Sequence, residues 1–413
     1  MPALPSSPIP AVLAKLGTLD TDAICDLRPY LDTVPDPRSR RGRWYPLTAI
    51  LTICACAAIS GAKSIDEIAE WGQRAPQHLL EAIGIRPHPF TWRRSPSAPT
   101  IDRVLTRIDA HALDTAIGAY LAHRHRTATD HSTGTADPPP PAAGAIAVDG
   151  KALKGSARLD QPRRHLLSAL THHRPATLAQ TEVGSKTGET RHFRPLLQDL
   201  DLAGAVVTSD ALHTVKDHLK WLVEDKGAHY VAVVKANQPT LYAQVKGLPW
   251  NDAPIARTRS ETGHGRRESR SVKTMGVPEI LGGIAFPCAR LAIRLHRRRK
   301  PAGKPQTRET AYAVTSLDAH QATSAELARY LRGHWAIENS SHHIRDTVFG
   351  EDASTVHTGS APRAMAALRN LAIGVLKVMG ADNIAKTVRA IRDLPERALP
   401  LFGIGYEPDP SGT

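Results

Sequence analysis

The sequence predicts an α/β fold in which an all-α N-terminal domain precedes a mixed sheet with helices on its faces. Residues 1–125 carry apolar side chains at helical spacing. Residues 145–235 instead alternate short apolar strands with helices, the pattern of a sheet covered by helices. In residues 240–322 this succession of strands and helices stops. Arg-rich segments, in which the type of side chain alternates from one residue to the next, are separated there by Gly and Pro. They therefore predict a mainly β insertion.

The N-terminal domain combines buried helices with a basic loop. The apolar stretch 47–62 is shorter than the ~20 residues that a membrane span requires, so it predicts a buried helix. Ser64 and Glu67 stand in capping-box relation at the start of the next helix. Beside them lies the basic loop 38–43, so the domain is either a DNA-binding unit of helix-turn-helix type or a helical cap. The predicted helices cover residues 11–30, 47–62, 64–73, 76–84 and 100–123.

The composition also predicts domain boundaries and location. Residues 126–144 are rich in Pro, Thr and Ala without periodicity, and they predict a linker between the N-terminal domain 1–125 and a domain at 145–380. Residues 381–413 form a C-terminal extension. The four cysteines contain no CxxC pair, and the N-terminus shows no signal-peptide pattern, so we expect a reducing cytoplasm.

Two of the predicted strands end in an aspartate. The strand at 145–150 ends in Asp149, and the strand at 205–210 ends in Asp210. In sheets of this type, strand ends open onto a crevice where ligands bind. Asp210 also precedes a helix, so the alternative is that it serves only as an N-cap. The other elements predicted are strands at 165–171, 177–183 and 229–235, and helices at 191–200 and 213–226.

A long helix is predicted over 324–352, and Glu338 lies in the middle of its apolar stripe. A carboxylate that faces a core must be paired, protonated or bound to a metal. The alternative to a functional role is an interhelical salt bridge or a polar pocket. Trp335, on the same stripe, is expected in the core. The stripe comprises Leu327, Leu331, His334, Trp335, Glu338, His342, Arg345 and Phe349.

The two aspartates and Glu338 together predict a metal centre. Three acidic groups that converge on one crevice repel each other unless cations neutralise them. Oxygen ligands of this kind suit Mg²⁺ or Mn²⁺, and two such ions about 3.5–4 Å apart favour chemistry on a phosphodiester. Zinc bound by His334, Glu338 and His342 is rejected, because ligands on two helical turns span about 12 Å.

The charge of the chain indicates a polyanionic partner. Lys and Arg outnumber Asp and Glu by 53 to 40, which gives a net charge of +13 and a pI near 9.8. The excess is clustered at 38–43, 266–273 and 294–300. Clustering favours nucleic acid over a role in solubility alone.

The chain carries four separated motifs: VDGKALKGS at 148–156, SDALHT at 209–214, VVKANQPTL at 233–241, and HWAIENSSHHIRDTVFGED at 334–352. Together they resemble the DDE transposases of the ISAs-type insertion sequences, the H-repeat-associated group. The N-terminal segment 36–72 resembles the helical domain associated with that family, and 98–109 and 359–377 also fit, so the resemblance covers nearly the whole chain. The chain departs from the family's usual residues at Val215, Ser341, His343 and Arg345.

The resemblance implies a ribonuclease-H-like core in which Asp149, Asp210 and Glu338 bind two Mg²⁺ ions. The implied reaction is hydrolytic nicking at transposon ends, followed by attack of the freed 3′-hydroxyl on target DNA. Expected partners are the terminal inverted repeats, target DNA and a second copy of the chain, in a nucleoid-associated location. The alternatives are a metal-dependent nuclease and a non-catalytic DNA-binding protein derived from a transposase. The residues expected to contact DNA are Lys151, Lys154, His213, Lys235, Arg297, Arg298, Arg299, His334, His342 and Arg345.

Overall fold

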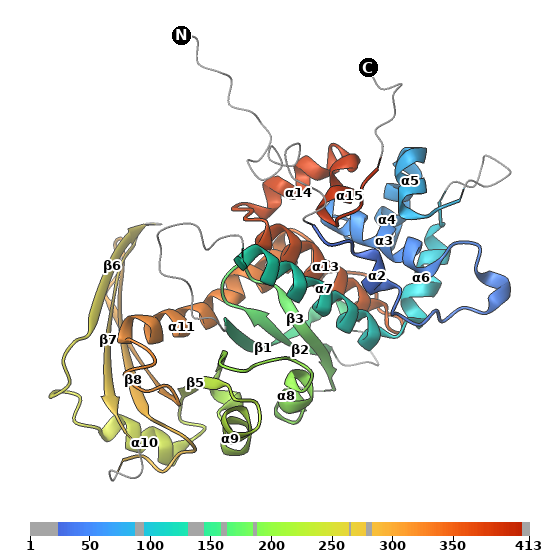
Figure 1. The fold of residues 1–413 in the computed structure, drawn as a ribbon. Coiled ribbons are helices and arrows are strands. Elements are labelled where there is room, and N and C mark those ends of the chain that lie inside the picture. The colour runs from blue at the N-terminus through green and yellow to red at the C-terminus, as the bar shows by residue number, and fades with distance from the viewer. Residues whose placement is uncertain are drawn as a thin grey trace.

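A mixed sheet of nine strands runs through the molecule, with helices on its faces and a helical mass at one end (Figure 1). The strand order is β3-β2-β1-β4-β5-β9-β8-β7-β6. This confirms the mixed α/β class predicted from the sequence. The computed structural model describes residues 24–86, 95–130, 144–157, 163–184, 188–263, 266–277 and 283–406. Residues 11–23 of the first predicted helix and 131–143 of the predicted linker lie outside these ranges.

Five strands form the central part of the sheet. β1 lies antiparallel to β2, which continues antiparallel to β3 as the predicted hairpin. On its other side β1 lies parallel to β4, and β4 lies parallel to β5. The bounds are β1 Ala145–Leu153, β2 Arg164–Thr171, β3 Thr177–Val183, β4 Val206–Ser209 and β5 His229–Val234.

The predicted β insertion extends the same sheet. β9 pairs antiparallel with β5, and β8, β7 and β6 follow as antiparallel neighbours. The insertion begins with a helix, α10 (Pro239–Gly247), whose first position is occupied by a proline that suits a helix start. The strands are β6 Arg257–Gly263, β7 Arg266–Gly276, β8 Leu291–Pro301 and β9 Thr307–Thr315.

Helices cover both faces of the sheet. α8 (Glu189–Leu197), α9 (Lys216–Glu224) and α10 pack on one face, where Phe193, Leu222 and Val245 join the strands in one hydrophobic core. α11 (Ser324–Ile337) covers β4, β5 and the insertion strands on the other face. Its N-terminus is closed by the capping box of Thr323 and Glu326.

A separate core forms within the helical end of the molecule, and it draws on both ends of the described chain. Buried side chains from residues 27–121 pack with buried side chains from 349–404. The helix α3 (Leu47–Ile59) is central and almost entirely buried, as predicted. In the described residues no helix is long and apolar enough to cross a membrane. The other helices are α2 Arg28–Leu31, α4 Ile65–Arg74, α5 Gln77–Ile83, α6 Ala98–Arg107, α7 Ala110–Asp130, α13 Ala361–Val378, α14 Ile384–Arg392 and α15 Ala398–Leu401.

The predicted helix 100–123 is two helices, α6 and α7, because the chain turns extended at Ile108. α7 then continues to Asp130, so residues 126–130 of the predicted linker are helical. α7 packs closely on β3: a Cβ added at Gly118 would stand 2.0 Å from the Leu178 carbonyl oxygen. The helical core and the sheet therefore meet directly at this helix.

The predicted helix 324–352 is interrupted. α11 passes into a π-helical turn, Glu338–His342, and then into α12 (His343–Thr347), so the helical run ends at residue 347. A π turn inserts an extra residue into the helix and is frequent at functional sites. It rotates all side chains that follow it relative to an ideal α-helix.

Candidate active site

Asp149 and Asp210 lie on neighbouring strands at the same level. β1 and β4 are parallel, and their last paired residues are Val148 and Ser209. The next residue along the chain is an aspartate in both cases, so register alone brings the two together. Asp149 is not at a strand end as predicted, since β1 continues to Leu153 along β2. It lies where the pairing of β1 with β4 stops.

Burial and neighbouring negative charges raise the pKa of Asp149 to about 6. Burial is the largest cause, followed among the causes that raise the pKa by the charges of Asp210 and Glu189. The backbone N–H of Gly150 donates to Asp149 Oδ1 at 2.9 Å and acts in the opposite direction. A nearby cation would stabilise the ionised form of a carboxylate in this environment.

Asp210 serves as an N-cap. Its Oδ1 accepts hydrogen bonds from the backbone N–H groups of Leu212 and His213, at 3.0 and 3.4 Å. These bonds fix the short turn that follows β4 and hold one carboxylate oxygen in place. The capping role that the sequence offered as an alternative for Asp210 is therefore present. It is compatible with a site in which the other carboxylate oxygen, Oδ2, binds a ligand.

Glu338 is exposed, which corrects the prediction that it faces the core. The buried stripe of α11 runs through His334 to Ile337, and Ile337 packs against Ala147 of β1. An apolar residue occupies the buried position, while the carboxylate one residue later points to solvent. Trp335, expected in the core, is 39% exposed. Burial resumes at Ser341 within the π turn and continues at Arg345 and Phe349, at a spacing of four residues.

His342, at the end of the π turn, is the helix residue that approaches the aspartates. Its Nδ1 lies 3.7 Å from Asp149 Oδ2. Burial, with the nearby charges of Arg345 and Lys151, lowers the pKa of His342 to about 3. A neutral imidazole beside a carboxylate donates or accepts one hydrogen bond without adding charge.

His334 and His213 are buried, so neither is placed for direct contact with DNA. His334 Nδ1 lies 3.3 Å from the hydroxyl of Thr208, and burial lowers the pKa of His334 to about 4. His213 is 1% exposed, and neither of its ring nitrogens has a hydrogen-bond partner among the described residues. Both rings lie within the protein around β4.

The basic residues expected near the aspartates are mostly engaged in ion pairs. Lys151 is buried, and its Nζ donates to both oxygens of Asp346 at 2.8 Å. Lys154 is exposed and bonds Asp352 at 2.6 Å. Arg345 is 1% exposed and bonds the buried carboxylate of Glu351, so a contact with phosphate would require this pair to break.

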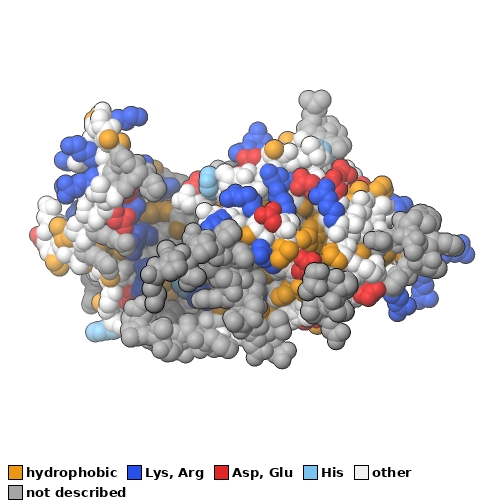
Figure 2. All heavy atoms as spheres, turned by 90° about the horizontal axis from the view of Figure 1, so that it is seen from above, with side chains coloured by type: hydrophobic (Ala, Val, Ile, Leu, Met, Phe, Trp, Pro, Cys, Tyr) orange, Lys and Arg blue, Asp and Glu red, His pale blue; other side chains and the backbone are white. Residues whose placement is uncertain are grey.

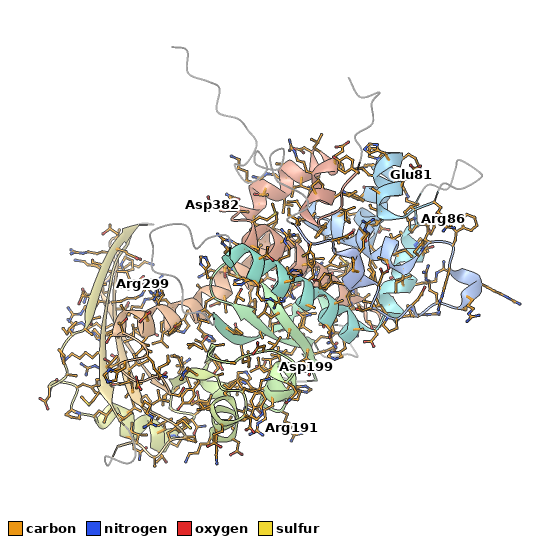
Figure 3. All side chains as sticks on the ribbon, in the orientation of Figure 1. Glu81, Arg86, Arg191, Asp199, Arg299 and Asp382 are labelled. Carbon is orange, nitrogen blue, oxygen red and sulfur yellow. The ribbon has the colours of Figure 1, made fainter. Side chains whose placement is uncertain are left out.

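The insertion places its arginines on two different faces. Arg297 donates to Glu268 at 2.7 and 3.2 Å, and Arg299 lies 3.9 Å from the same carboxylate. Arg298 is exposed and stands directly opposite Arg308 on β9. Figure 2 shows Lys and Arg side chains gathered at this end of the molecule, and Figure 3 locates Arg299 on the insertion strands. Lys235 is exposed just after β5.

Sequence reasoning did not single out Glu189, which lies close to the aspartates. It opens α8, is 5% exposed, and lies 3.7 Å from His213 Nε2 and 3.9 Å from His165 Nδ1. Its negative charge also acts on Asp149. A glutamate in the first turn of a helix is common, so the sequence carries no signal that separates this residue from an ordinary helix start.

The described residues contain no group of three His, Cys, Asp or Glu side chains close enough to hold one metal ion. The two aspartates are adjacent, but Glu338 points to solvent. A pocket of about 460 Å³ lies elsewhere, between the π turn, α12, α13 and α14, and is lined by Ile344, Lys377 and Asp382 among others. Figure 3 shows Asp382 at the helical end, away from the strands.

Comparison with known proteins gives the family. Residues 141–374 match the family described as "Transposase DDE domain", and residues 29–121 match "DDE_Tnp_1-associated". The first match spans more than half of the chain, so the chain belongs to the DDE transposase family. The motifs at the two aspartates lie within it.

Two curated relatives from Escherichia coli are similar over most of their length. "Putative transposase YncI" of O157:H7 is 28% identical, covering 86% of this chain and 88% of the relative. "H repeat-associated putative transposase YhhI" of K12 is 27% identical, covering 92% of this chain and 98% of the relative. A piggyBac transposase in a synaptic complex with hairpin DNA aligns over 94% of this chain and 85% of its own. Its identity is 10% and its TM-score 0.34, too low to support an argument.

Proposed function

We propose that this chain is a DNA transposase that hydrolyses phosphodiester bonds at transposon ends and transfers the freed 3′ ends into target DNA. Asp149, Asp210 and Glu338 form its acidic triad, and the five central strands form a ribonuclease-H-like core. The partners are terminal inverted repeats, target DNA and a second copy of the chain. A cytoplasmic, nucleoid-associated location follows from this activity.

The observation that carries the proposal is the register of β1 and β4. Two carboxylates from strands far apart in sequence meet where the pairing ends, within the region that matches the DDE domain. Mutual repulsion of this kind is relieved by a divalent cation. The raised pKa of Asp149 supports the same interpretation, because burial and then the charges of Asp210 and Glu189 disfavour its ionised form, which a cation would stabilise.

The donor set at this place fits a hard divalent ion. Asp149 and Asp210 offer carboxylate oxygens, which Mg²⁺ and Mn²⁺ prefer, and Asp210 is held rigidly by its capping bonds. When bound, two such ions supply activation of the attacking oxygen and stabilisation of the leaving one. The protein positions the scissile phosphate and holds the two aspartates side by side.

Glu338 enters the triad through a local rearrangement. It is exposed at the first position of the π turn, while His342 at the last position faces Asp149. Rotation of this turn would exchange the two side chains at the aspartates. The π turn supports this proposal because such single-turn insertions in α-helices are rare and are frequently found at functional sites.

The arginines of the insertion supply a surface for DNA. Like charges opposite each other on neighbouring strands destabilise a sheet, yet Arg298 stands opposite Arg308 with both side chains exposed. A phosphate backbone relieves that repulsion. Lys154 and Lys235, also exposed, extend the positive surface toward the aspartates.

The test uses the full-length protein, labelled transposon-end fragments and Mg²⁺ or Mn²⁺. Asp149→Asn and Asp210→Asn should each lower the rate of strand cleavage by more than about a thousandfold, since metal ions supply several kcal/mol to such reactions. Asp199→Asn, on an exposed residue at the end of α8, is the matched control and should cut normally. Normal cleavage by Asp210→Asn would overturn the assignment.

The same assay separates the alternatives when a target plasmid is added. A transposase yields joined products and requires two ends in one complex, so the active species on DNA should contain at least two chains. A simple nuclease nicks ends and never joins them. A non-catalytic DNA-binding protein retards the fragments without cutting them under any divalent ion.

A further inference from the structure

A third carboxylate lies against both segments that carry the catalytic aspartates. A Cβ added at Gly150, next to Asp149, would stand 2.7 Å from each carboxylate oxygen of Glu189. On the other side, Glu189 Oε2 lies 3.7 Å from Nε2 of His213, three residues after Asp210. One buried side chain therefore lies close to Gly150, which follows Asp149, and to His213, three residues after Asp210.

Among the described residues, Glu189 has no strong cationic partner that would explain its burial. Its side chain is 7% exposed, and its ion-pair partners in the described part of the chain are the imidazoles of His165 and His213. Both distances, 3.9 and 3.7 Å, exceed that of a good hydrogen bond. A buried carboxylate is costly unless it is paired, and the start of α8 offsets only part of this cost. The negative charge of Glu189 therefore adds to that of the aspartates, and no described Lys or Arg pairs with it.

His213 is a second, independent sign that the buried polar groups of this region are not all hydrogen-bonded by the described residues. It is 1% exposed, and both ring nitrogens lack a hydrogen-bond partner among the described residues. Buried polar groups are nearly always bonded. Its backbone N–H donates to Asp210 Oδ1 at 3.4 Å, so a movement of the His213 ring is transmitted to the turn that holds Asp210.

We propose that Glu189 is a positioning residue of the metal centre, which strengthens the negative potential at Asp149 and Asp210 and holds the Asp210 turn through His213. This inference rests on the proposed function, because it takes the two aspartates as metal ligands. Glu189 acts through its charge and through His213 without touching the ion. Its close neighbours include Gly150 and two imidazoles.

The experiment measures Mn²⁺ binding to the metal-free full-length protein without DNA, by the electron paramagnetic resonance signal of free Mn²⁺. Glu189→Gln removes the charge and keeps the shape. It should weaken Mn²⁺ binding by about tenfold to a hundredfold, as for other residues that support metal ligands. Glu182→Gln is the matched control: Glu182 lies on β3 of the same sheet and pairs with Arg164 at 3.1 Å. It removes one charge as well and should bind as wild type does.

Asp149→Asn distinguishes failure of this inference from failure of the proposed function. If wild type binds Mn²⁺, Asp149→Asn loses it, and Glu189→Gln binds within twofold of wild type, the role of Glu189 is refuted and the metal centre stands. If Asp149→Asn binds as wild type does, both proposals fall. Should Glu189→Gln not fold, Glu189→Asp withdraws the charge by one methylene, and Mn²⁺ binding within twofold of wild type would then refute the inference.

Discussion

His172 and His334 share one hydroxyl group, that of Thr208. His172 Nε2 lies 2.8 Å and His334 Nδ1 3.3 Å from its Oγ1. The two imidazoles come from the β2–β3 turn and from α11, so this hydroxyl on β4 joins the helix to the sheet beside Asp210. Burial lowers the pKa of His172 to about 3 and that of His334 to about 4. Both rings are therefore neutral in the folded protein near pH 7.

Stability should fall steeply in mild acid because of these two rings. Unfolded, each histidine binds a proton near pH 6.5, whereas the folded protein resists protonation down to about pH 4 and 3. Their contribution is present above pH 6.5 and is lost as the pH falls through that value toward the folded pKa. Denaturation followed from pH 7 to pH 4.5 should show it, and His334→Gln should reduce the slope by about one proton. An equal slope in that variant would contradict the assignment.

Arg298 and Arg308 should contribute to DNA binding without contributing to stability. Both are exposed on one face of the insertion, so changing both to Gln should flatten the dependence of log affinity on log salt by about one unit for each lost phosphate contact. The loss should be equal for all DNA sequences. The measurement is fluorescence anisotropy over a series of salt concentrations.

Arg297→Gln is the matched comparison, because Arg297 lies on the opposite face and donates to the buried carboxylate of Glu268. It should lower the free energy of unfolding by about 1–3 kcal/mol and change the salt dependence less. If Arg297→Gln flattens the salt dependence as much as the double variant does, the division of the two faces is wrong.

Glu351 should be among the most sensitive residues to substitution in the chain. It is 2% exposed and bonds two buried guanidinium groups, those of Arg345 at 2.8 Å and Arg369 at 3.3 Å. Glu351→Gln would leave two buried positive charges with a neutral partner, at a cost of about 3–5 kcal/mol. Thermal denaturation measures this, with the exposed Glu309→Gln as control. A melting temperature unchanged from wild type would contradict the buried triad.

Removal of residues 1–125 should prevent folding of what remains. The helical core combines 27–121 with 349–404, so the deletion would expose the apolar surface of α13, including Leu368, Leu371 and Val375. Exposed apolar patches of this size lead to aggregation. The truncated chain should be recovered as aggregates on size-exclusion chromatography. A monodisperse product with cooperative unfolding would show that the sheet folds without the helices.

Much of the sheet could be predicted because its strands are short apolar runs between turns. The hairpin of β2 and β3, and the strands β4 and β5, lie within one or two residues of their predicted bounds. The adjacency of Asp149 and Asp210 also follows from a simple rule, since parallel neighbours end at the same edge. These features depend on local pattern and on register.

Other features depend on packing that a sequence does not display. Ile337 and Glu338 differ by one residue, and which of them faces β1 is decided by the fit of α11 and by the π turn. The position of Glu189 depends on how α8 crosses Gly150, which carries no side chain to exclude it. The pairing of Glu351 with Arg369 requires α13 to pack against the segment that follows α12.

The helical core has a consequence for the order of events during synthesis. Residues 27–121 leave the ribosome long before α13–α15, yet they share one core with those helices. The apolar faces of the first helices therefore stay exposed until the sheet and the last helices have been synthesised. Such exposure favours chaperone binding. Contacts between such distant segments also slow folding. A prematurely terminated chain would lack the helices that close this core, so only nearly full-length chains should reach the native state.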